Sequence, residues 1–357
     1  MRKSIQNVMK VVFVVIGTLV GAGFVSGREI FSFFFVYSFT GIIGIIFSCS
    51  IIGCVVYRVF YLCKIYDIKS YHDFCNKLQN LKVCEKVSKN NFKFSYFLNC
   101  TVNLFLLITF YVMVSGFSSF LKQEFSVNSI LGSIMIVTLC YFIFLKNING
   151  LIKISNYLIP ISIFMIICIS MKNIEFIKNY NVIFNTNEYI KSEMFCIKGL
   201  FMAILYGCYN CIILIPVLVT LRKQILNNQI MKCVSIVSCI ILLILSFAIY
   251  NLLLQGNEEI FSLEMPIVEI VKRYGESYKV IYRAIIGVSI FTTAVSSGCS
   301  LLNNCSKSEM EFRRNLVLIS VSALFFSQIS FSMLVNYLYP VLGIFGAIEI
   351  FLIFKIK

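Results

Sequence analysis

The residues with the clearest capacity for chemistry lie in a glycine-rich part of the first long apolar stretch. Gly17, Gly21, Gly23 and Gly27 fall within eleven residues, and Glu29 follows them. Because each glycine weakens a helix by about 1 kcal/mol relative to alanine, we expect the helix to be interrupted near the central two. An interruption frees backbone N–H groups for a carboxylate, and carbonyl oxygens for an ammonium group or a metal cation.

The same glycines admit a second interpretation. Gly17 with Gly21, and Gly23 with Gly27, have the G-x-x-x-G spacing at which intact transmembrane helices pack closely. On that interpretation the helix is continuous and the segment is a packing surface.

Two charged residues, Arg28 and Glu29, follow the glycines directly. Ionisable residues inside a membrane are functional candidates by default. Glu29 would accept a proton, pair with a cationic substrate, or form a gate with Arg28 at the outer entrance. The simpler alternative is an ion pair at the outer interface.

A second polar cluster interrupts the apolar stretch at 199–221. Tyr206, Gly207, Tyr209 and Asn210 lie near its middle, and Pro216 follows. Polar side chains at this depth need partners, and lining a cavity supplies them. We therefore expect a second interrupted helix here, and contact between packed helices is the alternative.

Hydroxyl groups mark one face of the stretch at 280–302. Ser289, Thr292, Thr293 and Ser296 have helical spacing, which places them on a common side. They would supply oxygen ligands to a small cation, or bond back to carbonyl groups of their own helix.

The elements that carry these residues are transmembrane helices. Hydrophobic residues make up 59% of the 357 and charged residues 13%, whereas a soluble domain has about 25% charged. This excludes a soluble enzyme, a secreted disulfide scaffold and a disordered chain. About 20 apolar residues cross a membrane, and ten stretches qualify: 11–37, 40–63, 94–121, 127–145, 151–171, 199–221, 234–254, 280–302, 316–335 and 337–354. The predicted fold is an all-α integral membrane protein.

The net charge of +15 is best explained by membrane orientation. An even number of spans puts both termini on one side. Most Lys and Arg residues then fall in the segments on that side, where few acids accompany them, as the positive-inside rule requires. We expect a multi-pass protein of the cell membrane with both termini cytoplasmic, with the lipid bilayer and not a nucleic acid as its large-scale partner. The sequence does not indicate an oligomeric state.

Two long connections occupy equivalent places if the chain is two five-helix halves. The inner connection at 67–92 follows span two, and the outer one at 255–279 follows span seven. Each contains a short helical pattern, for which Ser70 is a candidate N-cap in the first and Pro266 would open the helix in the second. We predict one domain over 1–357, with inverted repeats at 9–171 and 194–357, an arrangement common in secondary transporters. The alternative is a pair of unrelated surface helices.

Motifs of common enzyme classes are absent from the sequence. It contains no P-loop, H-E-x-x-H or G-x-S-x-G motif, and no paired catalytic carboxylates. Cys208-x-x-Cys211 lies in an apolar span without the strand-to-helix context of a redox site. We predict that the protein is not an enzyme and has no catalytic residues and no resident cofactor.

The motif I-G-x-x-V-G-A-G-F, from Ile16 to Phe24, resembles the first-helix motif of the amino acid–polyamine–organocation (APC) superfamily. Its continuation to Glu29 is most similar to the YkvI-like membrane proteins, which are regarded as amino acid permeases. The resemblance implies a LeuT-type fold of five plus five inverted helices, with interrupted helices 1 and 6.

The resemblance also implies the residues of the site. The substrate would lie at Gly21, Ala22 and Gly23, faced by Tyr206, Tyr209 and Asn210. A coupling sodium ion would lie among Gly17, Val20, Ser289, Thr292 and Thr293, and a proton is the other coupling ion found in the superfamily. No other metal is implied.

The resulting hypothesis is a symporter, a secondary active permease that moves an amino acid or a related small organic solute by alternating access. The alternative is a membrane sensor or accessory protein that keeps the fold and binds a small ligand without moving it.

Overall fold

The computed structural model describes residues 2–68, 70–80, 94–145, 161, 163–171, 193–222, 227–306 and 308–355. Within these residues the secondary structure is entirely helical. The helices are α1 (Arg2–Leu19), α2 (Ala22–Val25), α3 (Arg28–Phe33), the 3-10 helix η1 (Phe35–Tyr37), α4 (Ser38–Ile65), α5 (Tyr71–Asn80), α6 (Phe94–Phe125), α7 (Ser129–Leu145), α11 (Glu193–Leu221), α12 (Asn228–Leu253), α13 (Glu258–Ser262), α14 (Pro266–Lys272), α15 (Glu276–Cys305), α16 (Glu309–Phe326) and α17 (Phe331–Lys355).

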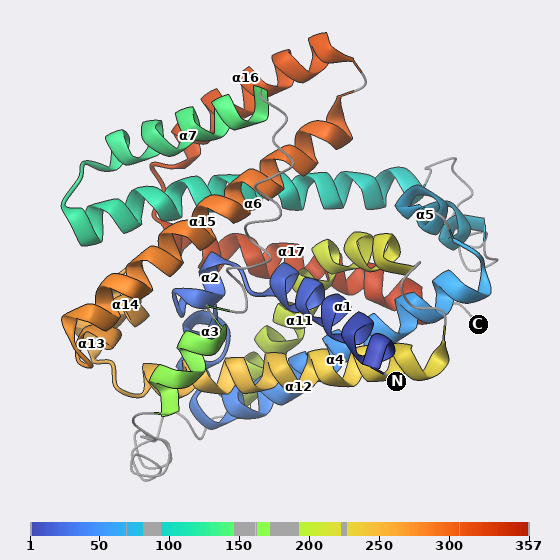
Figure 1. The fold of residues 1–357 in the computed structure, drawn as a ribbon, viewed down its shortest axis with the longest axis horizontal. Coiled ribbons are helices and arrows are strands. Elements are labelled where there is room, and N and C mark those ends of the chain that lie inside the picture. The colour runs from blue at the N-terminus through green and yellow to red at the C-terminus, as the bar shows by residue number, and fades with distance from the viewer. Residues whose placement is uncertain are drawn as a thin grey trace.

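The centre of the bundle is α11, which packs against α4 on one side and α17 on another. The α12 helix covers α4, and α15 lies along α6 (Figure 1). The α7 and α16 helices pack against each other at the periphery. Val317, Leu318 and Val321 of α16 are exposed apolar side chains, as expected of a surface that faces lipid.

Six helical segments of the described residues are long and apolar enough to cross a membrane: Arg28–Ile65, Leu98–Phe125, Cys196–Leu221, Asn228–Leu253, Glu276–Cys305 and Phe331–Lys355. This supports a multi-pass membrane protein. Val8–Leu19 and Ser129–Leu145 are shorter apolar helices. The fifth predicted span, at 151–171, lies mostly outside the described residues, although 163–171 is helical. The count of ten spans and their inverted repeat remain predictions.

The expected boundary between the last two spans is wrong. The sequence suggested a division at Asn336, but α16 ends at Phe326 and α17 begins at Phe331. The polar run between them ends one helix and caps the next, because the Ser330 hydroxyl accepts the backbone N–H of Met333 at 3.3 Å. Asn336 therefore belongs to α17.

The two long connections supply short helices at opposite ends of the bundle. The α5 helix lies at the end where both termini are found, and α13 and α14 lie at the other (Figure 1). Ser70 caps α5 by accepting the N–H of Asp73 at 3.1 Å, and Pro266 is the first residue of α14. Both helix starts are as predicted.

Candidate solute site at the break in the first helix

The predicted interruption of the first helix is confirmed. The α1 helix ends at Leu19, and Gly21 is extended, with φ −89° and ψ −173°. One turn of helix follows as α2, and Gly27 then takes the left-handed conformation at φ 82° before α3 begins. A non-glycine residue would be strained at that φ, so Gly27 fixes the second bend.

Within the part of the chain that the structure describes, the break leaves carbonyl oxygens without hydrogen-bond partners at the end of α1. The Val20 N–H still reaches the Ile16 carbonyl at 2.7 Å, but the Gly21 N–H turns to Leu19 at 3.1 Å. No hydrogen bond from the described residues reaches the carbonyl oxygens of Gly17, Thr18 and Val20. These oxygens lie at the negative end of the helix dipole, where a cation is favoured.

Open space adjoins the break on one side. A Cβ atom built on Gly21 would meet nothing within 4 Å, and Gly17, Thr18 and Gly21 are only half-buried. Ala22, by contrast, is fully buried. Of the predicted glycine segment, Gly21 is therefore the part that borders free volume.

Glu29 lies on the other side of the same break. Its side chain is buried, and the hydroxyl of Tyr209 donates to its Oε2 atom at 2.6 Å. Its Oε1 atom packs so closely on Gly23 that a Cβ there would lie 2.2 Å from it. Among the described residues no Lys or Arg side chain forms an ion pair with Glu29. A buried carboxyl group thus meets the break, and the described residues supply no counter-charge to it.

The tyrosine that contacts this carboxyl group belongs to an aromatic cluster. The Tyr209 ring lies 4.8 Å from that of Tyr339 on α17 and 5.4 Å from that of Tyr206, measured between centroids. Phe33 adds a ring 5.6 Å from Tyr209. The electron-rich faces of such rings favour cations, so the surroundings suit an ammonium group as well as a proton.

The expected interruption of the second polar span is wrong, because α11 is a continuous helix from Glu193 to Leu221. Its polar groups are satisfied without a break. The Asn210 amide donates back to the Tyr206 carbonyl at 2.9 Å. Gly207 serves helix packing, since a Cβ there would lie 3.3 Å from the carbonyl oxygen of Ser48 on α4. Tyr206 and Tyr209 reach the site from an intact helix, and Asn210 bonds to its own backbone.

The expected gate between Arg28 and Glu29 is also absent. The Arg28 guanidinium donates to the Phe261 carbonyl at 2.9 Å, and it lies over the Phe31 ring, with its Cζ atom 5.2 Å from the centroid. Because consecutive residues of a helix point about 100° apart, the two side chains of this short helix diverge. Arg28 holds the connection to α13 and α14, and Glu29 faces the site.

That connection packs against the bend at Gly27, which follows the break. The Ile267 N–H donates to the Ser26 carbonyl at 3.3 Å, which joins α14 to the segment after α2. Glu264 accepts the N–H of Ser332 at 2.7 Å, and Gln123 accepts that of Met265 at 3.0 Å. The connection is thus tied to α6 and α17 as well as to Arg28.

The hydroxyl stripe on α15 is bonded within its own helix. Thr292 donates to the Val288 carbonyl at 2.9 Å, and Thr293 to that of Ser289 at 2.8 Å. No hydrogen bond in the described residues joins these side chains to Gly17 or Val20. The link between α15 and the broken helix is Tyr282, whose hydroxyl donates to the Val25 carbonyl at 2.7 Å.

Sequence reasoning missed two of the residues at the site, Tyr339 and Tyr282. Both are polar aromatic side chains within apolar helices, and the rule that singled out Tyr206 and Tyr209 applies equally to them. The missing information was spatial, because nothing in their spacing links them to the glycine segment.

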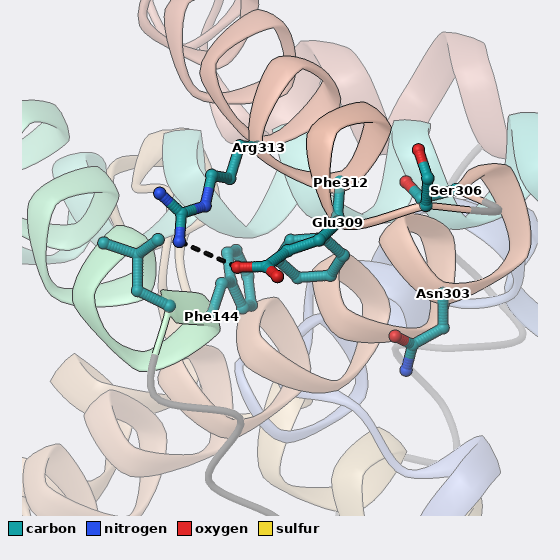
Figure 2. Close-up of a pocket in the computed structure, with 8 residues that line it drawn as sticks. Phe144, Asn303, Ser306, Glu309, Phe312 and Arg313 are labelled. Atoms are coloured by element: carbon teal, nitrogen blue, oxygen red, sulfur yellow. Dashed lines mark hydrogen bonds and ion pairs between the residues drawn. The ribbon is translucent and has the colours of Figure 1, made fainter.

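A separate hollow of about 360 Å³ lies where α7, α15 and α16 meet (Figure 2). Its lining includes Asn303, Phe312 and an ion pair in which the Arg313 Nη2 atom lies 2.7 Å from the Oε1 atom of Glu309. It shares no lining residue with the predicted site, so it gives no support to that site.

Comparison with known proteins finds a relative along nearly the whole chain. The sequence is 22% identical over 348 residues to the uncharacterized membrane protein YkvI of Bacillus subtilis (strain 168). The alignment covers 96% of this chain and 94% of that protein. No family model matches the sequence.

Among solved structures, similar chains include the manganese transporter of Eremococcus coleocola. In its complex with an aromatic bis-isothiourea substituted compound, that transporter is 9% identical to this protein, with a TM-score of 0.46. The alignment covers 98% of this chain and 71% of the transporter chain. A mutant of the same transporter gives a TM-score of 0.47 at the same identity and coverage.

Proposed function

We propose that this protein is a secondary active transporter that moves an amino acid, or a related small organic solute with an ammonium group, by alternating access and coupled to a cation. The observation that carries the proposal is the buried carboxyl group of Glu29, which lies at a helix break and has no cationic partner among the described residues. The permease-like motif from Ile16 to Phe24 supports the same proposal.

The carboxyl group needs a partner that changes during the cycle. An unpaired buried carboxylate costs several kcal/mol even after relaxation of the protein, so Glu29 is neutral unless a cation binds beside it. A proton or the ammonium group of a solute meets this need. Competition between the two for one carboxyl group is a direct way to couple transport to a proton gradient.

The ammonium group would have three kinds of partner in the site. Glu29 supplies the charge, the carbonyl oxygens of Gly17 and Val20 accept hydrogen bonds, and the Tyr209 and Tyr339 rings supply cation–π contacts. Gly21 borders the free volume in which the rest of the solute would lie. Sodium among Gly17, Val20, Ser289, Thr292 and Thr293 remains the alternative coupling ion.

The connection at α13 and α14 supports alternating access. Phe261 of α13 bonds to Arg28 and Ile267 of α14 bonds to Ser26, and in the proposed cycle these bonds close the site toward that end of the bundle. Release of these bonds would open it. The break at Gly21 and the bend at Gly27 are points where α2 and α3 can tilt relative to α1.

The test is uptake into proteoliposomes that contain the purified full chain. Labelled amino acids and simple amines are offered with an imposed proton gradient, a sodium gradient, or neither, and binding is measured in parallel in detergent. We expect accumulation of at least one of these solutes above its external concentration under a gradient. Binding without accumulation under any gradient would instead favour the sensor or accessory protein.

A further inference from the structure

A second buried carboxyl group, Glu349, lies in the last part of α17. Only 2% of the surface of Glu349 is exposed to solvent. The Tyr71 hydroxyl of α5 donates to its Oε1 atom at 3.3 Å, and its buried Oε2 atom has no hydrogen-bond partner among the described residues. The carboxyl group is therefore covered by α5 and only half satisfied.

Among the side chains that the structure describes, the titratable groups that face Glu349 supply no positive charge. From α5 these are Tyr71 and Cys75, and from α11 the nearest is Cys211. Burial, and then the nearby Glu349, raises the pKa of Tyr71 well above its ordinary value, so this hydroxyl keeps its proton and remains a donor.

Among the described residues, the cations of the helices around Glu349 bond to other groups or are exposed. Lys77 of α5 donates to the Tyr66 carbonyl, and Arg222 of α11 donates to that of Val219. The Arg58 Nε atom of α4 donates to the Ile353 carbonyl at 3.3 Å, and Lys64 bonds to Asn228 at 2.9 Å. Lys355 of α17 itself is exposed. Glu124 of α6 pairs with Arg283, Arg28 of α3 bonds to the Phe261 carbonyl, and Glu29 of α3 accepts the hydrogen bond from Tyr209.

We propose that Glu349 is a second proton-binding site, which holds a proton while α5 packs over it and releases the proton to water when α5 moves away. A carboxylate in this position would be buried without a counter-ion, which costs several kcal/mol, so the closed arrangement requires the neutral form. Water reaches the group only when α5 leaves, and the carboxyl group then ionises.

This assignment rests on the proposed transport function for its purpose, since a transporter must open toward the end of the bundle that α5 covers. The two carboxyl groups are arranged around one helix. Tyr209 of α11 contacts Glu29, and Cys211, two residues on and about 200° around the helix, lies near Glu349. Opening at the α5 end would thus be tied to loss of a proton at a site separate from Glu29.

The test is amide hydrogen exchange of the α5 segment in the full-length protein, read by mass spectrometry over a pH series and expressed as protection relative to the unfolded rate. The measurement needs no substrate. In the wild type we expect protection of α5 to fall as the pH rises, by at most about tenfold per pH unit, starting at the pH at which the Glu349 carboxyl group ionises with α5 displaced, because one proton is linked to undocking.

Glu349→Gln keeps the shape and stays neutral, so we expect its α5 protection to be independent of pH. Two variants serve as controls. Glu29→Gln removes the other buried carboxyl group, and His72→Gln removes the histidine of α5 itself; both should retain the wild-type pH dependence.

The proposal is wrong if Glu349→Gln keeps the wild-type pH dependence, or if the wild type shows none. If Glu349→Gln does not fold, infrared titration of the wild type and Tyr71→Phe decides the matter. A protonated carboxyl band that persists above neutral pH and changes frequency in Tyr71→Phe supports the assignment, and its absence at neutral pH overturns it. A failure of transport in liposomes leaves these results unchanged, so the two proposals fail separately.

Discussion

Replacing Gly23 by alanine tests the close packing of the Glu29 carboxyl group against the helix break. The new Cβ would lie 2.2 Å from the Oε1 atom and 2.9 Å from the Cδ atom of Glu29, whereas ordinary contacts between heavy atoms are about 3.5–4.0 Å. The carboxyl group must therefore move by about 1 Å or more. Such a movement breaks the 2.6 Å hydrogen bond from Tyr209.

The expected loss of stability follows from these two effects. Overpacking of a dense interior costs about 1–3 kcal/mol, and a lost hydrogen bond adds about 1 kcal/mol. Gly23→Ala should therefore be destabilised by about 2–4 kcal/mol. Gly21→Ala is the matched control, because its Cβ meets nothing within 4 Å and its φ of −89° suits any residue. That change should be neutral or stabilise by up to about 1 kcal/mol.

The assay is thermal unfolding of the two purified variants in the same detergent, together with uptake in proteoliposomes. We expect Gly23→Ala to unfold several degrees below Gly21→Ala and to lose gradient-driven accumulation. Equal melting temperatures, or a lower one for Gly21→Ala, would refute the packing of Glu29 against Gly23.

Three further predictions concern other parts of the account. Tyr209→Phe removes the only described hydrogen-bond donor to Glu29, so solute uptake should fall at least several-fold and its pH optimum should shift. An unchanged pH profile of uptake would show that Tyr209 has no part in proton coupling. If sodium is the coupling ion, Thr293→Ala should reduce sodium-dependent uptake. The control Thr138→Ala removes a similar intrahelical hydrogen bond on α7 and should leave this uptake unchanged. Equal effects of the two changes would argue against a sodium site. Burial raises the pKa of Glu269, but Lys279 at 3.0 Å and Lys272 lower it by more, so the net pKa lies below the ordinary value of 4.5. The ionised Glu269 therefore contributes its full stabilisation above pH 4.5, and this stabilisation is lost as the pH falls below that value. Glu269→Gln should therefore lower the melting temperature at pH 7 and not at strongly acidic pH, and an equal loss at both pH values would contradict this.

The sequence was sufficient for features that depend on local chemistry. Closely spaced glycines predicted the break after Leu19, because backbone preference alone decides that point. The start of α14 at Pro266 followed from the fixed φ of proline in the same way. The membrane location followed from composition.

Features that depend on which helices pack together could not be predicted from the amino-acid sequence alone. Gly207 looked like a second break, but it lies against Ser48 of α4, and a single glycine does not show whether it is needed for bending or for close approach. Arg28 and Glu29 looked like a pair because they are adjacent. Their actual partners, Phe261 and Tyr209, are distant in sequence and approach the short helix α3 from different directions.

The central claim, that Glu29 binds the transported or coupled cation, is tested most directly by comparing gradient-driven accumulation in the wild type and Glu29→Gln. The amide can still accept the Tyr209 hydrogen bond, so the fold should survive the change. Glu309→Gln is the control, because that carboxyl group is exposed and pairs with Arg313 at the periphery. We predict at least a tenfold loss of accumulation for Glu29→Gln, as expected for the loss of a charged hydrogen bond, and none for Glu309→Gln. Wild-type accumulation by a folded Glu29→Gln protein would contradict the account.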